Sequence, residues 1–262
     1  MKFKRCSGIL MPISALPGGY GIGSLGAPAH AFVDFLQQAG QSIWQILPVG
    51  PTGYADSPYQ SCSAFAGNPY FIDLDLLVKD GLLKKSDFAK LSWGSDPEQV
   101  DYGTLYNQRF AVLRKAYQNF LRQRPVPGYD TPYPDDWYRF QFLSSDWLPD
   151  YCLYMAIKEE NGMVDWQKWP RELRLHDAAA LEAFRAEHAE QVEFWAFVQY
   201  EFDRQWRARC LRWTPMVVPA AWQAARRTTS LPTASCGATP CMTGTTTATP
   251  AMPGGSAVCA MP

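Results

Sequence analysis

Two short apolar runs with a helical pattern between them restrict the folds open to the first fifty residues. Ser7 to Ile13 is a short apolar run that ends in a Pro/Gly loop, as buried strands do. Pro28 begins a helical pattern that Gly40 ends, and a second apolar run, Ser42 to Leu47, is closed by Pro48. A strand, a helix and a strand at this spacing predict a βαβ unit, which requires a parallel sheet.

A long, mainly helical stretch follows from Leu76 to Arg209, and we expect it to form a subdomain on the rim of a barrel. A Pro-rich, irregular segment is expected at Gln123 to Trp137. The clearer helices are expected at Tyr106–Arg122, Asp150–Glu160, Ala178–Ala186 and Glu190–Arg209. With 262 residues, the chain is long enough for one large domain such as a (β/α)₈ barrel, or for two small ones.

The loop after the second strand has residues that suit a site for sugar rings. Tyr54-Ala-Asp-Ser-Pro-Tyr-Gln60 and Gly67-Asn-Pro-Tyr70 combine aromatic rings, hydroxyls, amides and a carboxylate. Aromatic faces cover the C–H side of a pyranose, and the polar groups hydrogen-bond its hydroxyls. On composition alone, a surface loop punctuated by Pro and Gly is favoured. The place of the loop at the C-terminal end of a parallel strand, where active-site residues collect, favours the sugar site.

Charge and cysteine content exclude several classes of protein. The formal net charge is −1, so no basic field indicates nucleic acid or an anionic membrane as partner, and no window is apolar enough for a membrane span. The seven cysteines include no Cys-x-x-Cys, which indicates reduced thiols rather than a disulfide framework. The basic start resembles a signal peptide, but Pro12 and Pro17 break the apolar run that follows. We therefore expect a cytoplasmic protein.

Three patterns indicate other functions and are set aside. Gly21-Ile-Gly-Ser-Leu-Gly26 fits the dinucleotide-binding motif, but a Pro/Gly loop separates it from the strand, and the next strand ends without the acidic residue that the motif needs. We expect a structural loop there. Asp73 and Asp75 are too few for a metal site, so capping or solvated roles are expected. The histidines have no metal-ligand spacing, so neither metal nor cofactor is expected; they are His30, His176 and His188.

Several longer blocks occur in a fixed order along the chain. They are Gly8-Ile-Leu-Met-Pro-Ile-Ser-Ala-Leu-Pro-Gly-Gly-Tyr-Gly-Ile-Gly-Ser-Leu-Gly26, Gln45-Ile-Leu-Pro-Val-Gly-Pro-Thr-Gly53, Asp56-Ser-Pro-Tyr-Gln60 and Gly67-Asn-Pro-Tyr70. This order closely resembles the 4-α-glucanotransferases (amylomaltases, disproportionating enzymes). The resemblance continues through Val100-Asp-Tyr102 to Phe197-Val-Gln-Tyr-Glu-Phe202 and covers about residues 6–209. It implies the N-terminal part of a (β/α)₈ TIM barrel with a helical inserted subdomain, acting on α-1,4-glucans.

The resemblance also implies roles for residues of the loop. Ser57 and Tyr59 resemble groups that line the subsites around the scissile bond, with Asp56 and Gln60 supporting the loop. Asn68 is expected to hold the backbone of the loop rather than to contact sugar. For each residue an alternative remains in which the side chain only shapes the turn. The functional reading is favoured over that alternative for Ser57 and Tyr59 alone.

The resemblance also implies a secondary glucan-binding site and the reaction that the family catalyses. Tyr54 resembles an aromatic of a secondary glucan-binding site, and Tyr102 resembles its companion. Family chemistry would be retaining transfer, in which an Asp attacks the anomeric carbon, a Glu protonates the leaving oxygen, and the glycosyl unit passes to another sugar. The three catalytic carboxylates of the family lie on later barrel strands. The resemblance therefore supplies no catalytic residue in this chain, and we expect no transfer by it.

The composition of the chain changes after Arg209. Asp203 is the last acidic residue, and Trp213–Pro262 carries ten Thr, ten Ala and seven Pro without a hydrophobic period, which is typical of disorder or a linker. The genetic code offers a sharper explanation. Codons for Thr239–Thr249 can be chosen so that a shift of one nucleotide gives Asn-Pro-Leu-Tyr-Asp-Trp-Asp-Tyr-His-Arg-Asp, which resembles the family downstream of the third strand. We therefore expect a frame disruption near Cys210, followed by an out-of-frame, disordered tail.

These expectations divide the chain into three parts: residues 1–75 with the βαβ unit and substrate loop, residues 76–209 with the helical insertion, and the tail, 210–262. Two strands cannot close a barrel, so the outer edge of the second strand is expected to meet no third strand, and stability to be marginal. Three functions remain open. The chain is a glucanotransferase acting on a maltooligosaccharide or α-glucan, a non-catalytic glucan-binding module, or an inert truncated product. Inertness is favoured over binding because the site would span both barrel halves.

Overall fold

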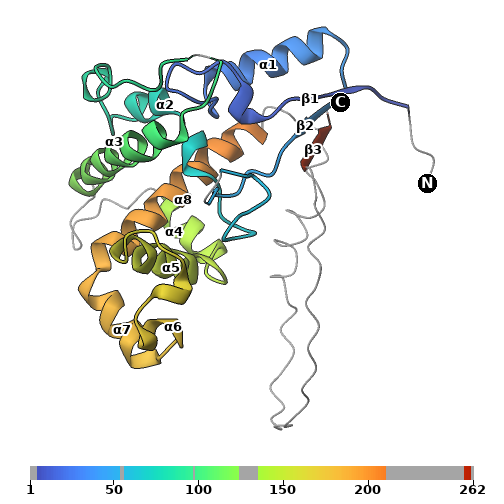
Figure 1. Cartoon of the computed structure of the whole chain (residues 1–262). Coiled ribbons are helices and arrows are strands. Elements are labelled where there is room, and N and C mark those ends of the chain that lie inside the picture. Colours follow the sequence, from blue (N-terminus) through green and yellow to red (C-terminus); the bar gives the residue numbers. More distant parts are fainter. Residues whose placement is uncertain (1–4, 54–55, 97, 124–134, 211–256, 261–262) are drawn as a thin grey trace.

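The computed structural model describes residues 5–53, 56–96, 98–123, 135–210 and 257–260 (Figure 1). A small sheet with helix α1 (Ala27–Gln38) beside it lies at one end, and the other helices make up the rest. In chain order the strands and helices are β1 (Gly8–Leu10), α1 (Ala27–Gln38), β2 (Ile43–Ile46), α2 (Leu74–Lys79), α3 (Tyr102–Gln123), α4 (Asp135–Leu143), α5 (Leu148–Glu160), α6 (Arg171–Arg174), α7 (Ala178–Glu187), α8 (Ala189–Cys210) and β3 (Ala257–Ala260). Short 3₁₀ turns at Ile13–Ala15, Pro69–Phe71, Lys85–Asp87 and Trp166–Lys168 lie between them.

The predicted βαβ unit is confirmed. Strands β1 and β2 pair in parallel, with Gly8 opposite Ile43 and Leu10 opposite Gln45. Helix α1 connects them and places Ala29, Val33 and Leu36 on its buried face, which is the spacing of an amphipathic helix. Both strands are shorter than predicted. Each is followed by a proline, at Pro12 and Pro48, which cannot donate a ladder hydrogen bond.

A third strand corrects one of the expectations. Strand β3 pairs antiparallel with β2 and gives the order β1-β2-β3, with Ile43 opposite Ala260 and Ile46 opposite Ala257. The prediction that the outer edge of β2 meets no third strand is therefore wrong, because an open edge presents N–H and C=O groups that any extended segment can pair with. Disorder is likewise wrong for residues 257–260. The remainder of the predicted tail beyond Cys210, residues 211–256 and 261–262, lies outside the described residues.

Four of the helices confirm the four predicted from sequence: α3, α5, α7 and α8. Helix α3 begins four residues earlier than predicted, because Asp101 caps it. Its carboxylate accepts hydrogen bonds from the backbone N–H and the hydroxyl of Thr104, at 3.0 and 2.6 Å. The capping residue therefore sets the start of the helix, one turn before the first clear apolar repeat.

Helix α4 was not predicted, and it begins inside the segment expected to be irregular. That expectation is wrong for Gln123, the last residue of α3, and for residues 135–137, whereas residues 124–134 lie outside the described residues. The reason is tertiary packing. Trp137 is buried, and its ring lies 5.3 Å from that of Phe120 and 5.2 Å from that of Tyr200. Burial of a large aromatic outweighs the local preference of the sequence.

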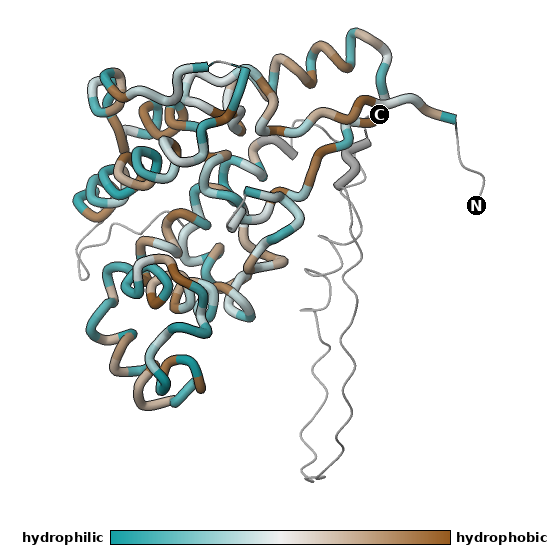
Figure 2. Tube along the Cα trace, in the orientation of Figure 1, coloured by the Kyte–Doolittle hydropathy of each residue, from teal (hydrophilic) through white to brown (hydrophobic). Residues whose placement is uncertain are grey.

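One hydrophobic core joins the sheet to the helices. Leu36 and Trp44 belong to the same cluster as Ile72, Leu113 and Phe197, each at most 1% exposed. The apolar runs of the strands and of several helices appear brown in Figure 2. The predicted boundary between residues 75 and 76 therefore does not separate two cores, and the three-part division remains a prediction.

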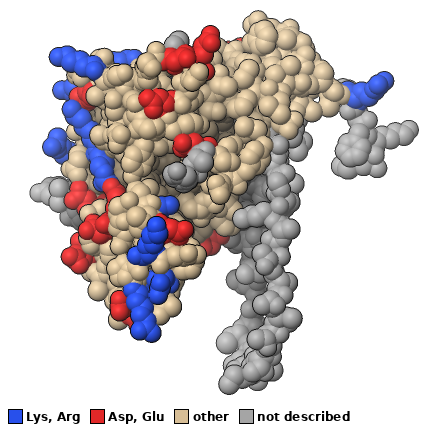
Figure 3. All heavy atoms as spheres, in the orientation of Figure 1, with Lys and Arg blue, Asp and Glu red and all other residues tan. Residues whose placement is uncertain are grey.

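The surface and the thiols add little to the functional case. Figure 3 shows basic and acidic side chains interspersed over the helical part, with few charges around α1. Within the described ranges, no helix combines the length and the apolar character needed to cross a bilayer. The cysteines whose side chains are described are free thiols: Cys6, Cys62 and Cys152.

Candidate functional site

The candidate site lies where the two parallel strands end. The turn after β1 and the loop after β2 meet there around a cavity of about 180 Å³. Parallel strands direct their C-terminal ends to the same edge of a sheet, so both loops reach it together. The polar residues that line the cavity are Ser14, Thr52, Asp56, Asn68 and Tyr102. Two of the six residues predicted to bind substrate, Asp56 and Tyr102, thus share one cavity.

Asp56 is held in an unusual backbone conformation. Its φ is +54°, in the left-handed region that asparagine and aspartate tolerate better than other residues. Its backbone N–H donates to the carbonyl of Gly53 at 3.1 Å. Burial raises the pKa of the Asp56 carboxyl above its ordinary value. The backbone conformation of Asp56 therefore accompanies a partly desolvated carboxylate at the wall of the cavity.

The predicted residues Ser57, Tyr59 and Gln60 form a tight turn next to the cavity rather than part of its wall. The N–H of Gln60 donates to the carbonyl of Ser57 at 3.1 Å, and Pro58 occupies the second position, as in a β-turn. The Ser57 hydroxyl accepts from the N–H of Tyr59 at 3.3 Å. Tyr59 is 59% exposed, so its ring faces solvent. The sixth predicted residue, Tyr54, lies outside the described residues.

Asn68 anchors the far end of the loop. It is 2% exposed, and its side-chain oxygen accepts from the N–H of Tyr70 at 3.0 Å. Its own N–H donates to the carbonyl of Val49 at 2.8 Å, directly after β2. The expectation that Asn68 holds the backbone of the loop is confirmed.

Tyr102 is the first member of a row of aromatic rings beneath the cavity. Its ring lies 6.0 Å from Tyr70, which lies 5.9 Å from Phe110, and Phe110 lies 5.4 Å from Trp195. Burial, and then the charge of Asp56, raise the pKa of both Tyr70 and Tyr102. Both phenols therefore stay protonated beside the carboxylate, and each keeps an O–H to donate.

Thr52 is a site residue for which the sequence predicted no role. It lines the cavity, and its hydroxyl oxygen is buried without a hydrogen-bond partner among the described residues. A buried hydroxyl without a partner costs free energy unless a ligand or water satisfies it. The signal in the sequence is its place in the block Gln45 to Gly53, which marks the segment but not the residue.

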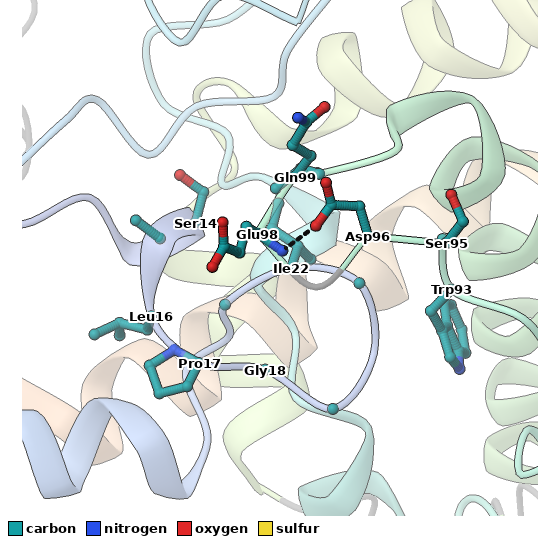
Figure 4. Close-up of a pocket in the computed structure, with 16 residues that line it drawn as sticks. Ser14, Leu16, Pro17, Gly18, Ile22, Trp93, Ser95, Asp96, Glu98 and Gln99 are labelled. Carbon is teal, nitrogen blue, oxygen red and sulfur yellow. Dashed lines mark hydrogen bonds between the residues drawn. The ribbon is translucent and has the colours of Figure 1, made fainter.

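A second hollow of about 470 Å³ lies between the glycine-rich loop after β1 and the segment around residues 93–100 (Figure 4). Glu98 directs its carboxylate toward this loop, and its N–H donates to Asp96 at 2.8 Å. Gly21, at φ +76°, has no room for a side chain, since an added Cβ would lie 2.4 Å from the carbonyl oxygen of Trp93. This packing supports the expectation that the glycine motif is a structural loop, which stays a prediction.

The two carboxylates that resembled a metal pair have structural roles. Asp73 caps α2 by accepting from the N–H of Leu76 at 3.0 Å, and it accepts from the Ser24 hydroxyl at 2.7 Å. Asp75 forms an ion pair with Lys85 at 2.5 Å. Capping is thus confirmed for Asp73. Across the described part of the chain, no group of three His, Cys, Asp or Glu side chains could hold a metal ion.

Comparisons with known proteins identify the family of the chain. The profile of a family described as 4-alpha-glucanotransferase matches residues 11–211. A 4-alpha-glucanotransferase from Clostridium butyricum is 45% identical over 199 residues, which are 75% of this chain and 39% of that protein. One from Streptococcus pneumoniae is 46% identical over 204 residues, covering 78% of this chain and 39% of that protein. The chain thus spans about two fifths of the length of these relatives.

Two solved amylomaltase structures also match most of this chain and less than half of their own length. The amylomaltase from Streptococcus agalactiae in complex with acarbose superposes with a TM-score of 0.72 at 41% identity, covering 78% of this chain and 40% of the other. The amylomaltase from Corynebacterium glutamicum shares the fold, with a TM-score of 0.52 at 16% identity over 76% of this chain and 27% of the other. The chain belongs to the 4-alpha-glucanotransferase family.

Proposed function

We propose that residues 5–210 are the N-terminal part of a (β/α)₈ glucanotransferase and that their loop from Thr52 to Asn68 binds an α-1,4-glucan. The observation that carries this proposal is the cavity at the C-terminal ends of β1 and β2, where Asp56 and Tyr102 meet. The substrate is a maltooligosaccharide or a longer α-glucan.

The groups around the cavity match the surface of a glucose unit. The Asp56 carboxylate accepts hydrogen bonds from sugar hydroxyls, and the hydroxyls of Tyr102 and Thr52 donate and accept them. The exposed ring of Tyr59 covers the C–H face of a neighbouring sugar, and hydrogen bonds of Ser57 and Gln60 hold the backbone around Tyr59 in a turn. The resemblance assigns Tyr54, which lies outside the described residues, and Tyr102 to a secondary glucan-binding site, and the proposal keeps that role for both.

The polypeptide on its own carries out no transfer. Retaining transfer requires two carboxyl groups about 5–5.5 Å apart, one as nucleophile and one as acid. Of the described residues that line the cavity, Asp56 alone carries a carboxylate. The family resemblance assigns the catalytic carboxylates to later strands. We therefore expect the part of the chain that matches the family, residues 11–211, to supply substrate contacts but no catalytic pair.

Tyr59→Ala is expected to weaken the binding of maltoheptaose about fivefold, because it removes roughly 1 kcal/mol of apolar contact with a sugar face. Isothermal titration calorimetry of the wild-type chain and the variant measures this. Phe142→Ala is the matched control, since Phe142 is an exposed ring on α4, 79% exposed. Equal affinities for wild type and Tyr59→Ala would contradict the role of Tyr59.

The same titration separates the two other candidate functions. The preformed cavity favours a non-catalytic glucan-binding module, which binds maltoheptaose but forms no transfer products. An inert product gives no heat of binding although near-ultraviolet circular dichroism shows fixed aromatic packing. The second result would contradict glucan binding by this chain.

We also propose that the chain from about residue 210 onward is read in a shifted frame. The family match ends at residue 211, next to the point where acidic residues cease. Sequencing the gene is expected to show a neighbouring frame that encodes Asn-Pro-Leu-Tyr-Asp-Trp-Asp-Tyr-His-Arg-Asp across Thr239–Thr249. Absence of family sequence from every other frame downstream would contradict the shift.

A further inference from the structure

The loop from Thr52 to Asn68 is called the glucan loop. Two glutamine side chains of α8 hydrogen-bond to the backbone at its end, Gly67, and just beyond it, Asp73. The side-chain amide of Gln199 accepts from the N–H of Gly67 at 2.7 Å and donates to its carbonyl at 3.0 Å. The side-chain amide of Gln205 likewise accepts from the N–H of Asp73 at 2.7 Å and donates to its carbonyl at 3.2 Å. Each glutamine thus pairs with both backbone groups of one residue, as a neighbouring strand would. The partners are 132 residues apart in sequence in both cases.

Burial makes these contacts costly to lose. Gln199 is 2% exposed and Gln205 is 3% exposed. A buried amide that loses its partner bears the full cost of desolvation. Between them on α8, Phe202 packs on Gly67 so closely that an added Cβ would lie 2.0 Å from the Phe202 ring. The loop backbone therefore lies directly on the helix.

A third contact comes from α3. Arg109 is 0% exposed, and one of its guanidinium nitrogens donates to the carbonyls of Tyr70 and Ile72, at 2.6 and 2.7 Å. Every one of these contacts is to backbone atoms of residues 67–73. They fix the path of the chain between Asn68 at the cavity and the start of α2 through backbone atoms rather than through its side chains.

We propose that Gln199 and Gln205 are positioning residues for glucan binding, through which the helical part of the chain fixes the glucan loop. This inference rests on the proposed function for its sugar-binding consequence. Neither glutamine lines the cavity, so each acts through Gly67 or Asp73 rather than on the sugar. A site held in its binding geometry before the ligand arrives avoids the entropy cost of ordering the loop on binding.

Gln199→Glu is the sharpest variant, because glutamate has the same size but an ionised carboxylate has no donor. The carboxylate would face the carbonyl of Gly67 without a hydrogen bond. Protonation restores a donor, and burial raises the pKa of such a carboxyl. The loosening of the loop backbone in Gln199→Glu is therefore expected at pH 8 and is expected to be smaller at pH 5. A loosening caused only by lost packing would be the same at both pH values.

Hydrogen exchange of the full chain, followed by mass spectrometry, tests the positioning role. In Gln199→Glu at pH 8, peptides spanning residues 61–73 are expected to exchange at least about tenfold faster than in wild type, while those of α5 keep the wild-type rate. Gln37→Glu, on the exposed face of α1, is the matched control and is expected to change neither. Unchanged exchange in residues 61–73, or an equal rise in every peptide, would overturn the proposal.

Two further measurements keep the outcome decisive. If Gln199→Glu does not fold, Gln199→Ala is measured in its place, with the same local exchange expected. Maltoheptaose affinity is then compared between wild type and the variant, and a loss of about fivefold or more is expected. Wild type that binds no maltoheptaose would contradict the proposed function, while the exchange data still decide whether the glutamines position the loop. Binding of equal strength in both would overturn the positioning role in glucan binding.

Discussion

Gly23→Ala is expected to destabilise the chain by at least about 3 kcal/mol, a cost at the upper end of overpacking effects. An added Cβ at Gly23 would lie 1.9 Å from the carbonyl oxygen of Ile13 and 2.9 Å from both backbone polar atoms of Leu16. The N–H of Gly23 also donates to the carbonyl of Ser14 at 3.1 Å. Because the neighbours are backbone atoms, no side-chain rotation relieves the contact.

Urea unfolding followed by near-ultraviolet circular dichroism measures this loss. Gly19→Ala is the control within the same loop, since nothing lies within 4 Å of a Cβ there, and its free energy of unfolding is expected to stay within about 0.5 kcal/mol of wild type. A dinucleotide-binding loop would need its second glycine for the approach of a ligand and would tolerate alanine in the free protein. Equal unfolding midpoints for Gly23→Ala and wild type would contradict the structural reading.

The βαβ unit could be predicted because local signals agree there. Prolines at 12 and 48 follow the strands, Gly40 takes a φ of +67° after α1, and the apolar spacing of α1 matches its buried face. Asp56 and Tyr102 were found through the family blocks that contain them. Their meeting in one cavity follows from the parallel strands, whose ends lie at one edge.

Features that depend on distant partners could not be predicted. Helix α4 forms because Trp137 is buried against Phe120 and Tyr200, which no local pattern records. Gln199 lies in a block that the resemblance marked, yet its role depends on Gly67, 132 residues away. The pairing of β3 with β2 also depends on a distant partner, because a strand edge pairs with the backbone of another segment and not with a particular sequence.

Among the described residues that line the cavity, Asp56 alone carries a carboxylate, and the largest functional effect is expected from this. Without a nucleophile and an acid flanking one glycosidic bond, no glycosyl-enzyme forms, and loss of acid–base catalysis alone slows such reactions by about 10²–10⁴-fold. Asp56 cannot take both roles, because the acid must be protonated when the nucleophile is ionised. We therefore expect this chain to bind glucan through the loop and to perform no transfer.

Incubation of the purified, folded chain with maltotriose measures this directly. Chromatography is expected to show neither glucose nor maltopentaose above a protein-free control, at any protein concentration. Products that increase in proportion to the protein, and that disappear in Asp56→Asn, would show a working catalytic site within this chain and would contradict the assignment of residues 5–210 as its glucan-binding part alone.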